Sequence, residues 1–177
     1  MLIGKRVYLR ALEPERDLEK CFYWINDREV TRNLLFYPPV SREAEMEWLS
    51  KMSRHGVDGT YSFGIVVKEN DVYIGNCGLH SINELSRHAE LGIMIGDRSY
   101  WDRGFGSDAV RILCSFAFRD LNLNRVYLNV YSNNPRAIKS YEKVGFRQEG
   151  LMRQHRFLEG VYVDQVVMGL LRDEFQE

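Results

Sequence analysis

The chain has 177 residues, of which 45% are hydrophobic and 12% aromatic, so we expect a single domain over residues 1–177 with one substantial core. Lysine and arginine total 24 against 25 acidic residues, and a net charge of −1 offers no basic field for nucleic acid or an anionic membrane. An odd set of three cysteines without a CxxC pair, and the lack of a signal-like or membrane-spanning apolar run, favour a reducing cytoplasm.

The first half of the chain predicts one strand, two helices and three further strands. Polar and apolar residues alternate over 6–11, as in a strand with one buried face. Pro14 suits the first turn of a helix, and Ser41 is a good N-cap for a second helix. Three strand-like runs joined by short turns, typical of an antiparallel meander, follow at 61–67, 72–82 and 90–95.

The second half alternates helices with strands. A helix with one apolar face begins at Gly104 and is followed by a strand over 125–131. A short helix from Pro135 precedes two strands, which Glu159 and Gly160 join as a hairpin turn. The whole order predicts an α/β fold, with a mixed sheet and helices on both faces.

A glycine-containing loop at 101–107 joins a strand to a helix. Gly104 and Gly106 permit close backbone approach, and the first amides of the helix can bind a pyrophosphate. A strand-to-helix turn can equally need glycine for its backbone angles alone. With Ala109 the loop also matches the GxGxxA pattern of NAD-binding folds, but no acidic residue occurs between 121 and 141 to bind the ribose.

A second motif lies at 134–146. Asn134, Ala137 and Tyr141 are spaced by three and four residues, so one face of a helix presents all three and can line a groove. Gly145 and Phe146 close the motif.

Together with the segment 89–95, these motifs make the sequence resemble the GNAT superfamily of N-acetyltransferases, within the branch of the Rim-type ribosomal-protein and bacterial spermidine acetyltransferases. The resemblance extends over nearly the whole chain, including its opening segment 7–10 and its last strands. It implies a mostly antiparallel, twisted sheet with a splayed central strand. It also implies an acetyl-CoA-dependent transferase. Independently of the resemblance, the four histidines show no metal-ligand spacing, so no metal is expected.

The resemblance further implies where acetyl-CoA binds. The glycine-loop amides would hold its pyrophosphate, the strand before the loop would pair with the pantetheine arm, and Asn134 would bind the same arm. Trp101 departs from the Gln or Arg usual at its position, which affects one side-chain contact. The implied binding residues are Ile93, Met94, Ile95, Trp101, Asp102, Arg103, Gly104, Phe105, Gly106, Ser107, Asn134 and Ala137.

Two residues are catalytic candidates. An amine attacks a thioester only through its lone pair, so a base must take its proton, and Glu90 is our candidate, acting through water. The alternative is a strand-edge charge that faces solvent. Tyr141, near the thioester sulfur in the family, is the candidate general acid for the departing thiolate, and otherwise a core tyrosine. Cys114 lies between apolar neighbours, so direct transfer is expected rather than an acyl-cysteine route.

The acceptor stays open between a peptide N-terminus, a polyamine, an amino sugar and an antibiotic, and so does the use of another acyl-CoA. A polyamine would suit the clustered acids Glu13, Glu15, Asp17 and Glu19, which can also be a solvated helix start. Candidate acceptor contacts are Trp24, Asp27, Tyr37 and Trp48. A CoA-binding sensor without turnover is the alternative function, and a homodimer through the last strands is a further open point.

Overall fold

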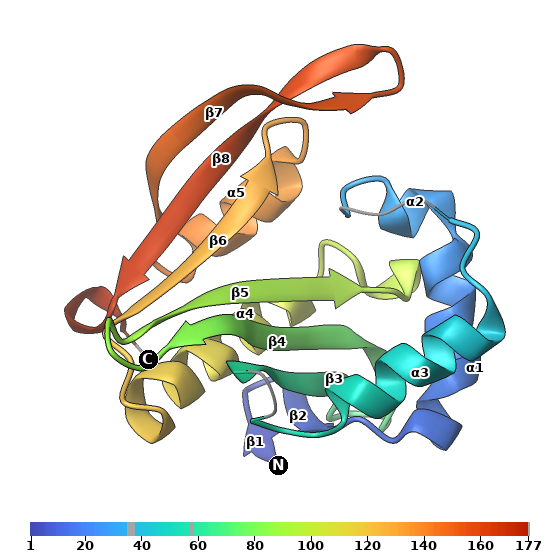
Figure 1. Cartoon of the computed structure of the whole chain (residues 1–177). Helices are drawn as coiled ribbons and strands as arrows, with labels where there is room; N and C mark the ends of the chain where they lie inside the picture. The colour runs from blue at the N-terminus through green and yellow to red at the C-terminus, as the bar shows by residue number, and fades with distance from the viewer. Residues whose placement is uncertain (35–37, 57–58, 177) are drawn as a thin grey trace.

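The computed structural model describes residues 1–34, 38–56 and 59–176, and is built on one eight-stranded sheet with the order β1-β2-β3-β4-β5-β6-β8-β7 (Figure 1). Every neighbouring pair is antiparallel except β5 with β6, as expected for a mixed, mostly antiparallel sheet. The strands are β1 (Leu2–Ile3), β2 (Val7–Ala11), β3 (Tyr61–Val67), β4 (Tyr73–Asn83), β5 (His88–Ile95), β6 (Arg125–Tyr131), β7 (Arg147–Leu158) and β8 (Val161–Leu171).

Helices cover both faces of the sheet, as predicted. Among the described residues, no helix has both the length and the apolar character that crossing a membrane requires. The α-helices are α1 (Pro14–Asn26), α2 (Arg28–Thr31), α3 (Arg42–Met52), α4 (Phe105–Ser115) and α5 (Pro135–Glu142). Short turns of 3-10 helix lie at Arg98–Tyr100 and Arg172–Glu174, and α4 continues into a π-helical turn at Phe116–Asp120.

Local sequence signals account for several boundaries. Pro14 opens α1, and the Ser41 hydroxyl accepts a hydrogen bond from the Ala44 N–H (3.1 Å) at the start of α3. Glu159 and Gly160 both have positive φ, 50° and 88°, the geometry of a two-residue hairpin turn between β7 and β8. The predicted element order is confirmed, while the two short elements β1 and α2 were not predicted.

The sheet divides where β5 meets β6. These parallel strands pair only at three positions, the last being Glu90 with Tyr127, and then diverge. Figure 1 shows the consequence: β6, β7 and β8 form one arm with α5, and β1 to β5 form the other. The splayed central strand that the family resemblance implied is therefore β5.

Two apolar clusters pack on opposite faces of the sheet. The larger lies under α4 and α5 and includes Leu113 and Leu128. The smaller joins α1 and α3 to the other face through Leu18, Leu49 and the ring of Tyr73. Helices α4 and α1 therefore pack on opposite faces of the β5 arm and support the strand that borders the splay.

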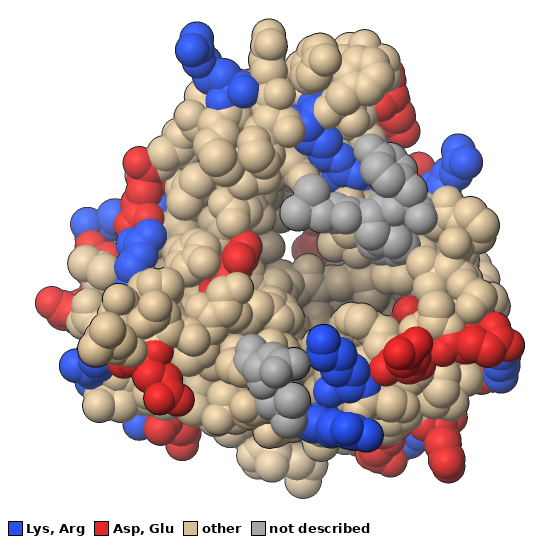
Figure 2. Space-filling model, viewed as in Figure 1, with Lys and Arg blue, Asp and Glu red and all other residues tan. Residues whose placement is uncertain are grey.

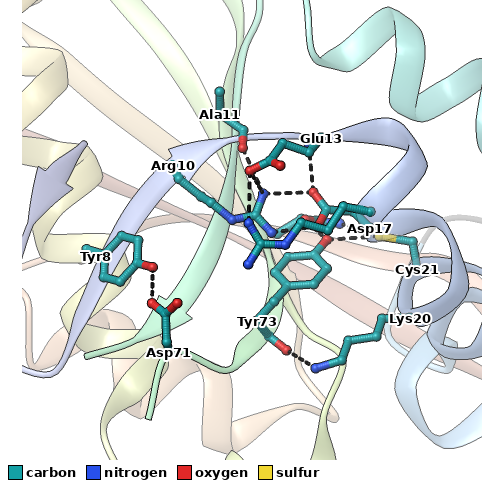
Figure 3. Close-up of polar contacts among 11 residues, drawn as sticks. Tyr8, Arg10, Ala11, Glu13, Asp17, Lys20, Cys21, Asp71 and Tyr73 are labelled. Atoms are coloured by element: carbon teal, nitrogen blue, oxygen red, sulfur yellow. Dashed lines mark hydrogen bonds and ion pairs between the residues drawn. The ribbon is translucent and has the colours of Figure 1, made fainter. Parts of the chain in front are cut away.

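Polar contacts anchor α1 to the sheet (Figure 3). The guanidinium of Arg10, on β2, donates to both carboxylate oxygens of Asp17 (2.8 and 2.5 Å) and lies over the ring of Tyr73. Asp17 is 1% exposed and also accepts from the Glu13 N–H (2.8 Å) at the start of α1. The Cys21 thiol bonds to the Tyr73 hydroxyl (2.9 Å), so a buried cluster fixes the helix that backs the end of β5.

Candidate active site

A cavity of about 530 Å³ lies in the splay between the two arms of the sheet. Its walls come from β5, the loop before α4, the first turns of α4, the strand β6 and the helix α5, with α2 and the residues after it at one end. Figure 2 shows the surface hollowed between the arms, with acidic and basic side chains interspersed around it. The cavity therefore opens the interior of the sheet to a ligand.

The open edge of β5 forms one wall. Residues 91–95 pair with β4 on one side, whereas β6 has already diverged on the other, and all five line the cavity. Backbone groups along such an edge can pair with an extended ligand as a neighbouring strand would. The indole N–H of Trp101 donates to the Ile95 carbonyl (2.7 Å), which ties the glycine loop to the end of this strand.

The glycine loop leads into the N-terminal end of α4. Gly104, the N-cap, has φ of 82°, a left-handed conformation that favours glycine. The Asp108 N–H donates to the Gly104 carbonyl (3.1 Å), so the amides of residues 105–107 precede the helical hydrogen-bond pattern and face out of the helix end. At Gly106 an added Cβ would meet only Ile95, at 3.7 Å, so the protein itself leaves room there.

Helix α5 presents the second motif to the cavity. Asn134, Ala137, Ser140 and Tyr141 all line it, and the Ser140 and Ser107 hydroxyls bond to each other (2.7 Å), which joins α5 to α4. The Asn134 side-chain oxygen accepts from the Ala137 N–H (3.2 Å), so this residue also caps the helix.

Tyr141 is partly buried in this wall, with its ring 6.0 Å from that of Phe146 between centroids. Burial raises the pKa of Tyr141 to about 12. The phenol is therefore protonated throughout the neutral range, as a hydrogen-bond donor or general acid must be.

Three basic side chains gather beside the glycine loop. Arg136, Lys139 and Lys143 on and after α5 recur at three and four residues and line the cavity. Arg136 lies over the Trp101 ring (3.9 Å) and within 3.8 Å of an Asp102 carboxylate oxygen. This end of the cavity suits a polyanion.

Acidic and amide side chains occupy the opposite face. Glu90, on β5, accepts a hydrogen bond from the Asn129 side-chain amide of β6 (2.8 Å). Burial lowers the pKa of His80, which pairs with Glu90 across β4 and β5, and the nearby carboxylate opposes that shift. Glu29, on α2, adds a second carboxylate to the cavity lining.

The structure brings together most of the residues predicted for the site. Both catalytic candidates and ten of the predicted acetyl-CoA residues line the cavity, whereas Arg103 and Phe105 do not. The Arg103 guanidinium instead bonds to the Ser99 carbonyl (3.3 Å) and lies over the Phe105 ring, which is itself buried in the core. The side chains of these two residues therefore do not contribute to the wall of the cavity.

The residues predicted to contact the acceptor lie outside the cavity lining, as far as the structure describes them. Trp24 is buried against Gly96, Asp27 caps α2 by accepting from the Glu29 N–H (2.9 Å), and Trp48 is exposed. None of these three lines the cavity, and Tyr37 lies outside the described residues. The acidic residues at 13–19 also lie elsewhere, since Asp17 is engaged by Arg10.

Several lining residues were missed by the sequence reasoning. Spacing alone identifies the basic face of α5, whereas strand pairing is needed to place the polar residues of β6 and β8 beside Glu90. The missed residues with side-chain chemistry are Glu29, Asn33, Tyr100, Asn129, Tyr131, Arg136, Lys139, Ser140, Lys143 and Gln165.

Neither metal nor thiol chemistry has an evident place in the described part of the chain. No cluster of three or more potential metal ligands occurs there. Cys21, Cys77 and Cys114 are buried, and burial raises the pKa of each thiol, that of Cys21 to about 11. A thiolate nucleophile is therefore disfavoured at all three positions.

Comparison with known proteins gives the family. Residues 6–147 match the acetyltransferase (GNAT) domain. The chain is 35% identical to the N-acetyltransferase p20 of Bacillus licheniformis, over 98% of this chain and 97% of that protein. It is 30% identical to the spermidine N(1)-acetyltransferase of Vibrio cholerae, again over 98% and 97%.

Solved structures agree with the sequence matches. A crystal structure of spermidine N-acetyltransferase from Vibrio cholerae in complex with CoA and spermine superposes with a TM-score of 0.85, at 28% identity, over 96% of this chain and 97% of that chain. The open edge of β5, the amides at the start of α4 and the basic face of α5 fit acetyl-CoA as the cosubstrate. The chain thus belongs to the GNAT family, and it is an acetyl-CoA-dependent N-acetyltransferase.

Proposed function

We propose that this enzyme acetylates a primary amine of a small molecule by direct attack of the amine on acetyl-CoA. The observation that carries the proposal is the cavity itself, which has a basic end at α5 and an acidic face at Glu90 and Glu29. The basic end suits the phosphates of the donor, and the acidic face suits an ammonium group that must lose a proton before it reacts.

The donor would lie along β5. The amides of residues 105–107 would hold the pyrophosphate at the start of α4, and Lys139 and Lys143 would add charge. The pantetheine arm would pair with the open edge formed by residues 93–95, opposite Asn134, whose side-chain nitrogen can donate to it. This arrangement directs the thioester toward Tyr141.

Glu90 is our candidate for the base. Its carboxylate lies at the last paired position of β5, so the strands open directly beside it. In our proposal this carboxylate takes the proton that the amine loses, directly or through a water molecule, as the new C–N bond forms.

Tyr141 is our candidate for the general acid. The C–N bond forms first and gives a tetrahedral intermediate. Collapse of this intermediate breaks the C–S bond, and the phenol hydroxyl stabilises the negative charge that develops on sulfur. With a pKa of about 12, the phenol is a weaker acid than a free tyrosine, so it contributes mainly by donating a hydrogen bond as the charge develops. The proton follows to sulfur and is replaced from solvent.

The acceptor class follows from the opposite face. Two carboxylates line that face, and the relatives named above include a spermidine N(1)-acetyltransferase. We therefore propose a cationic small-molecule amine, with polyamines first among the candidates, ahead of peptide N-termini and amino sugars. The three buried free cysteines support a reducing cytoplasm as the place of action.

The test is acetyl transfer by the purified protein. Incubation with acetyl-CoA and separate polyamines, N-terminal peptides and amino sugars should release free thiol, fastest with a polyamine, and mass spectrometry should find the acetylated amine. Fastest release with a peptide would contradict the proposed acceptor class. Tight CoA binding without release for any amine would instead favour a CoA sensor.

A further inference from the structure

Three polar side chains form a hydrogen-bonded row across the splay. Gln165, on β8, donates through its side-chain amide to the Asn129 carbonyl oxygen (3.0 Å). Asn129, on β6, donates in turn to one carboxylate oxygen of Glu90 on β5 (2.8 Å). All three side chains line the cavity, so the row lies inside the site and joins its two arms.

The position of the row in the sheet indicates what the row does. Backbone pairing between β5 and β6 ends at Glu90 and Tyr127, and Asn129 is two residues further along β6 on the same face. Beyond that pair, no backbone pairing joins β5 to β6 in the described strands, so any further link between the Glu90 carboxylate and β6 has to come from a side chain. The Asn129 amide supplies this link.

The polarity of the row is fixed by Glu90. An ionised carboxylate only accepts hydrogen bonds, so Asn129 must present its nitrogen to Glu90 and its oxygen to Gln165. Gln165 is 5% exposed, so its amide is held by the surrounding sheet. With one Glu90 oxygen bonded to Asn129, the amide fixes the rotation of the carboxylate and its other oxygen remains for a proton.

We propose that Asn129 and Gln165 are positioning residues, which hold the Glu90 carboxylate in the orientation for proton abstraction. The inference rests on the proposed function, in which Glu90 is the base. A positioning role differs from a purely structural link between the arms in one respect. Loss of a positioning residue affects turnover only while Glu90 is present as the base. Small errors in the placement of a catalytic group reduce turnover strongly.

A double-mutant cycle separates the two roles. The variants are Glu90→Gln, Asn129→Leu, Gln165→Leu and the double variant E90Q/N129L, with Gln148→Leu on the exposed part of β7 as the control for loss of an amide. For each we would measure kcat, the KM of acetyl-CoA, the KM of the amine and the thermal midpoint, with the amine that the panel identifies.

We expect Asn129→Leu to lower kcat about tenfold, as for a hydrogen bond to a charged group, and Gln165→Leu to lower it less, with the KM of acetyl-CoA and the control unchanged. In the Glu90→Gln background, Asn129→Leu should change kcat less than twofold. Equal losses in both backgrounds, or a KM of acetyl-CoA that rises with the loss, would overturn the positioning role while leaving Glu90 as the base. Full activity of Glu90→Gln would instead remove the base assignment and the positioning role together.

Discussion

At the scale of single residues, Tyr141 combines a partly buried ring, which packs against the core, with a place in the lining of the cavity. Its ring packs near Phe146, and burial raises its pKa to about 12. Tyr141→Phe keeps the ring and removes the donor, so we expect kcat to fall by about 10²–10³, within the usual range for an acid catalyst.

The KM of acetyl-CoA and the thermal midpoint should change little in this variant, because the hydroxyl makes no hydrogen bond with the described residues and the packing of the ring is retained. Steady-state kinetics over pH 6 to 10 would measure the effect. An unchanged kcat in a folded Tyr141→Phe protein would return Tyr141 to the role of a core residue.

His80 predicts a pH dependence of stability. Burial lowers its pKa below the reference value of 6.5, so the unfolded chain binds a proton that the folded protein binds less well. The contribution of His80 is complete above pH 6.5 and is lost as the pH falls through the folded-state pKa. The free energy of unfolding should therefore decrease less between pH 7.5 and 5.5 in His80→Gln than in the parent. Urea unfolding at both values tests this, with the exposed His155→Gln as control, and equal slopes in all three proteins would contradict it.

At the scale of elements, the sequence predicted those with strong local signals. Pro14, Ser41 and the Glu159-Gly160 turn each fix a boundary through their own backbone chemistry, and each appears where expected. The four-residue helix α2 was not predicted, because it is too short to show a helical pattern of apolar residues. Its start is fixed by the Asp27 side chain, which caps the helix.

The site residues fall into the same two groups, those that a local sequence pattern identifies and those that it does not. The glycine loop and the Asn134 to Tyr141 face are contiguous in sequence, so their motifs are visible there. By contrast, the row from Gln165 to Glu90 depends on the order β5-β6-β8, which brings together residues separated by 36 and 39 positions. Such a site follows from strand pairing, which local spacing does not determine.

A substitution at the start of α4 should have opposite effects on stability and on the binding of acetyl-CoA. Gly106→Ala adds a methyl group that meets only Ile95, at 3.7 Å, so we expect stability to rise by about 0.5–1 kcal/mol through the better helix propensity of alanine. The same methyl group faces the proposed pyrophosphate position, so the KM of acetyl-CoA should rise several-fold.

Gly104→Ala is the matched comparison. No atom lies within 4 Å of its added Cβ, but φ of 82° should cost about 1–2 kcal/mol of stability. Urea unfolding and steady-state kinetics of the two variants measure both quantities. An unchanged KM in Gly106→Ala would place the pyrophosphate away from the helix start.

At the scale of the whole molecule, the two arms of the sheet divide the charge of the cavity. The chain as a whole carries a net charge of −1, yet Arg136, Lys139 and Lys143 gather at one end of the cavity, while Glu29 and Glu90 lie on the other face. The splay places these groups in one cavity because α5 belongs to one arm and β5 to the other (Figure 1). A protein with almost no net charge can in this way attract a polyanionic donor and a cationic acceptor to the same opening.

This separation predicts how salt acts on each substrate. The Lys139→Gln/Lys143→Gln double variant should raise the KM of acetyl-CoA about twofold to thirtyfold, from two exposed charges that contribute roughly 0.2–1 kcal/mol each. Because salt screens the same charges, the KM of acetyl-CoA should rise with sodium chloride in the parent and rise less in the variant. Lys5→Gln, which removes an exposed lysine outside the cavity, should behave as the parent. Equal salt dependence in all three proteins would mean that the basic end of the cavity does not bind the donor, and that the backbone of the glycine loop and β5 holds it instead.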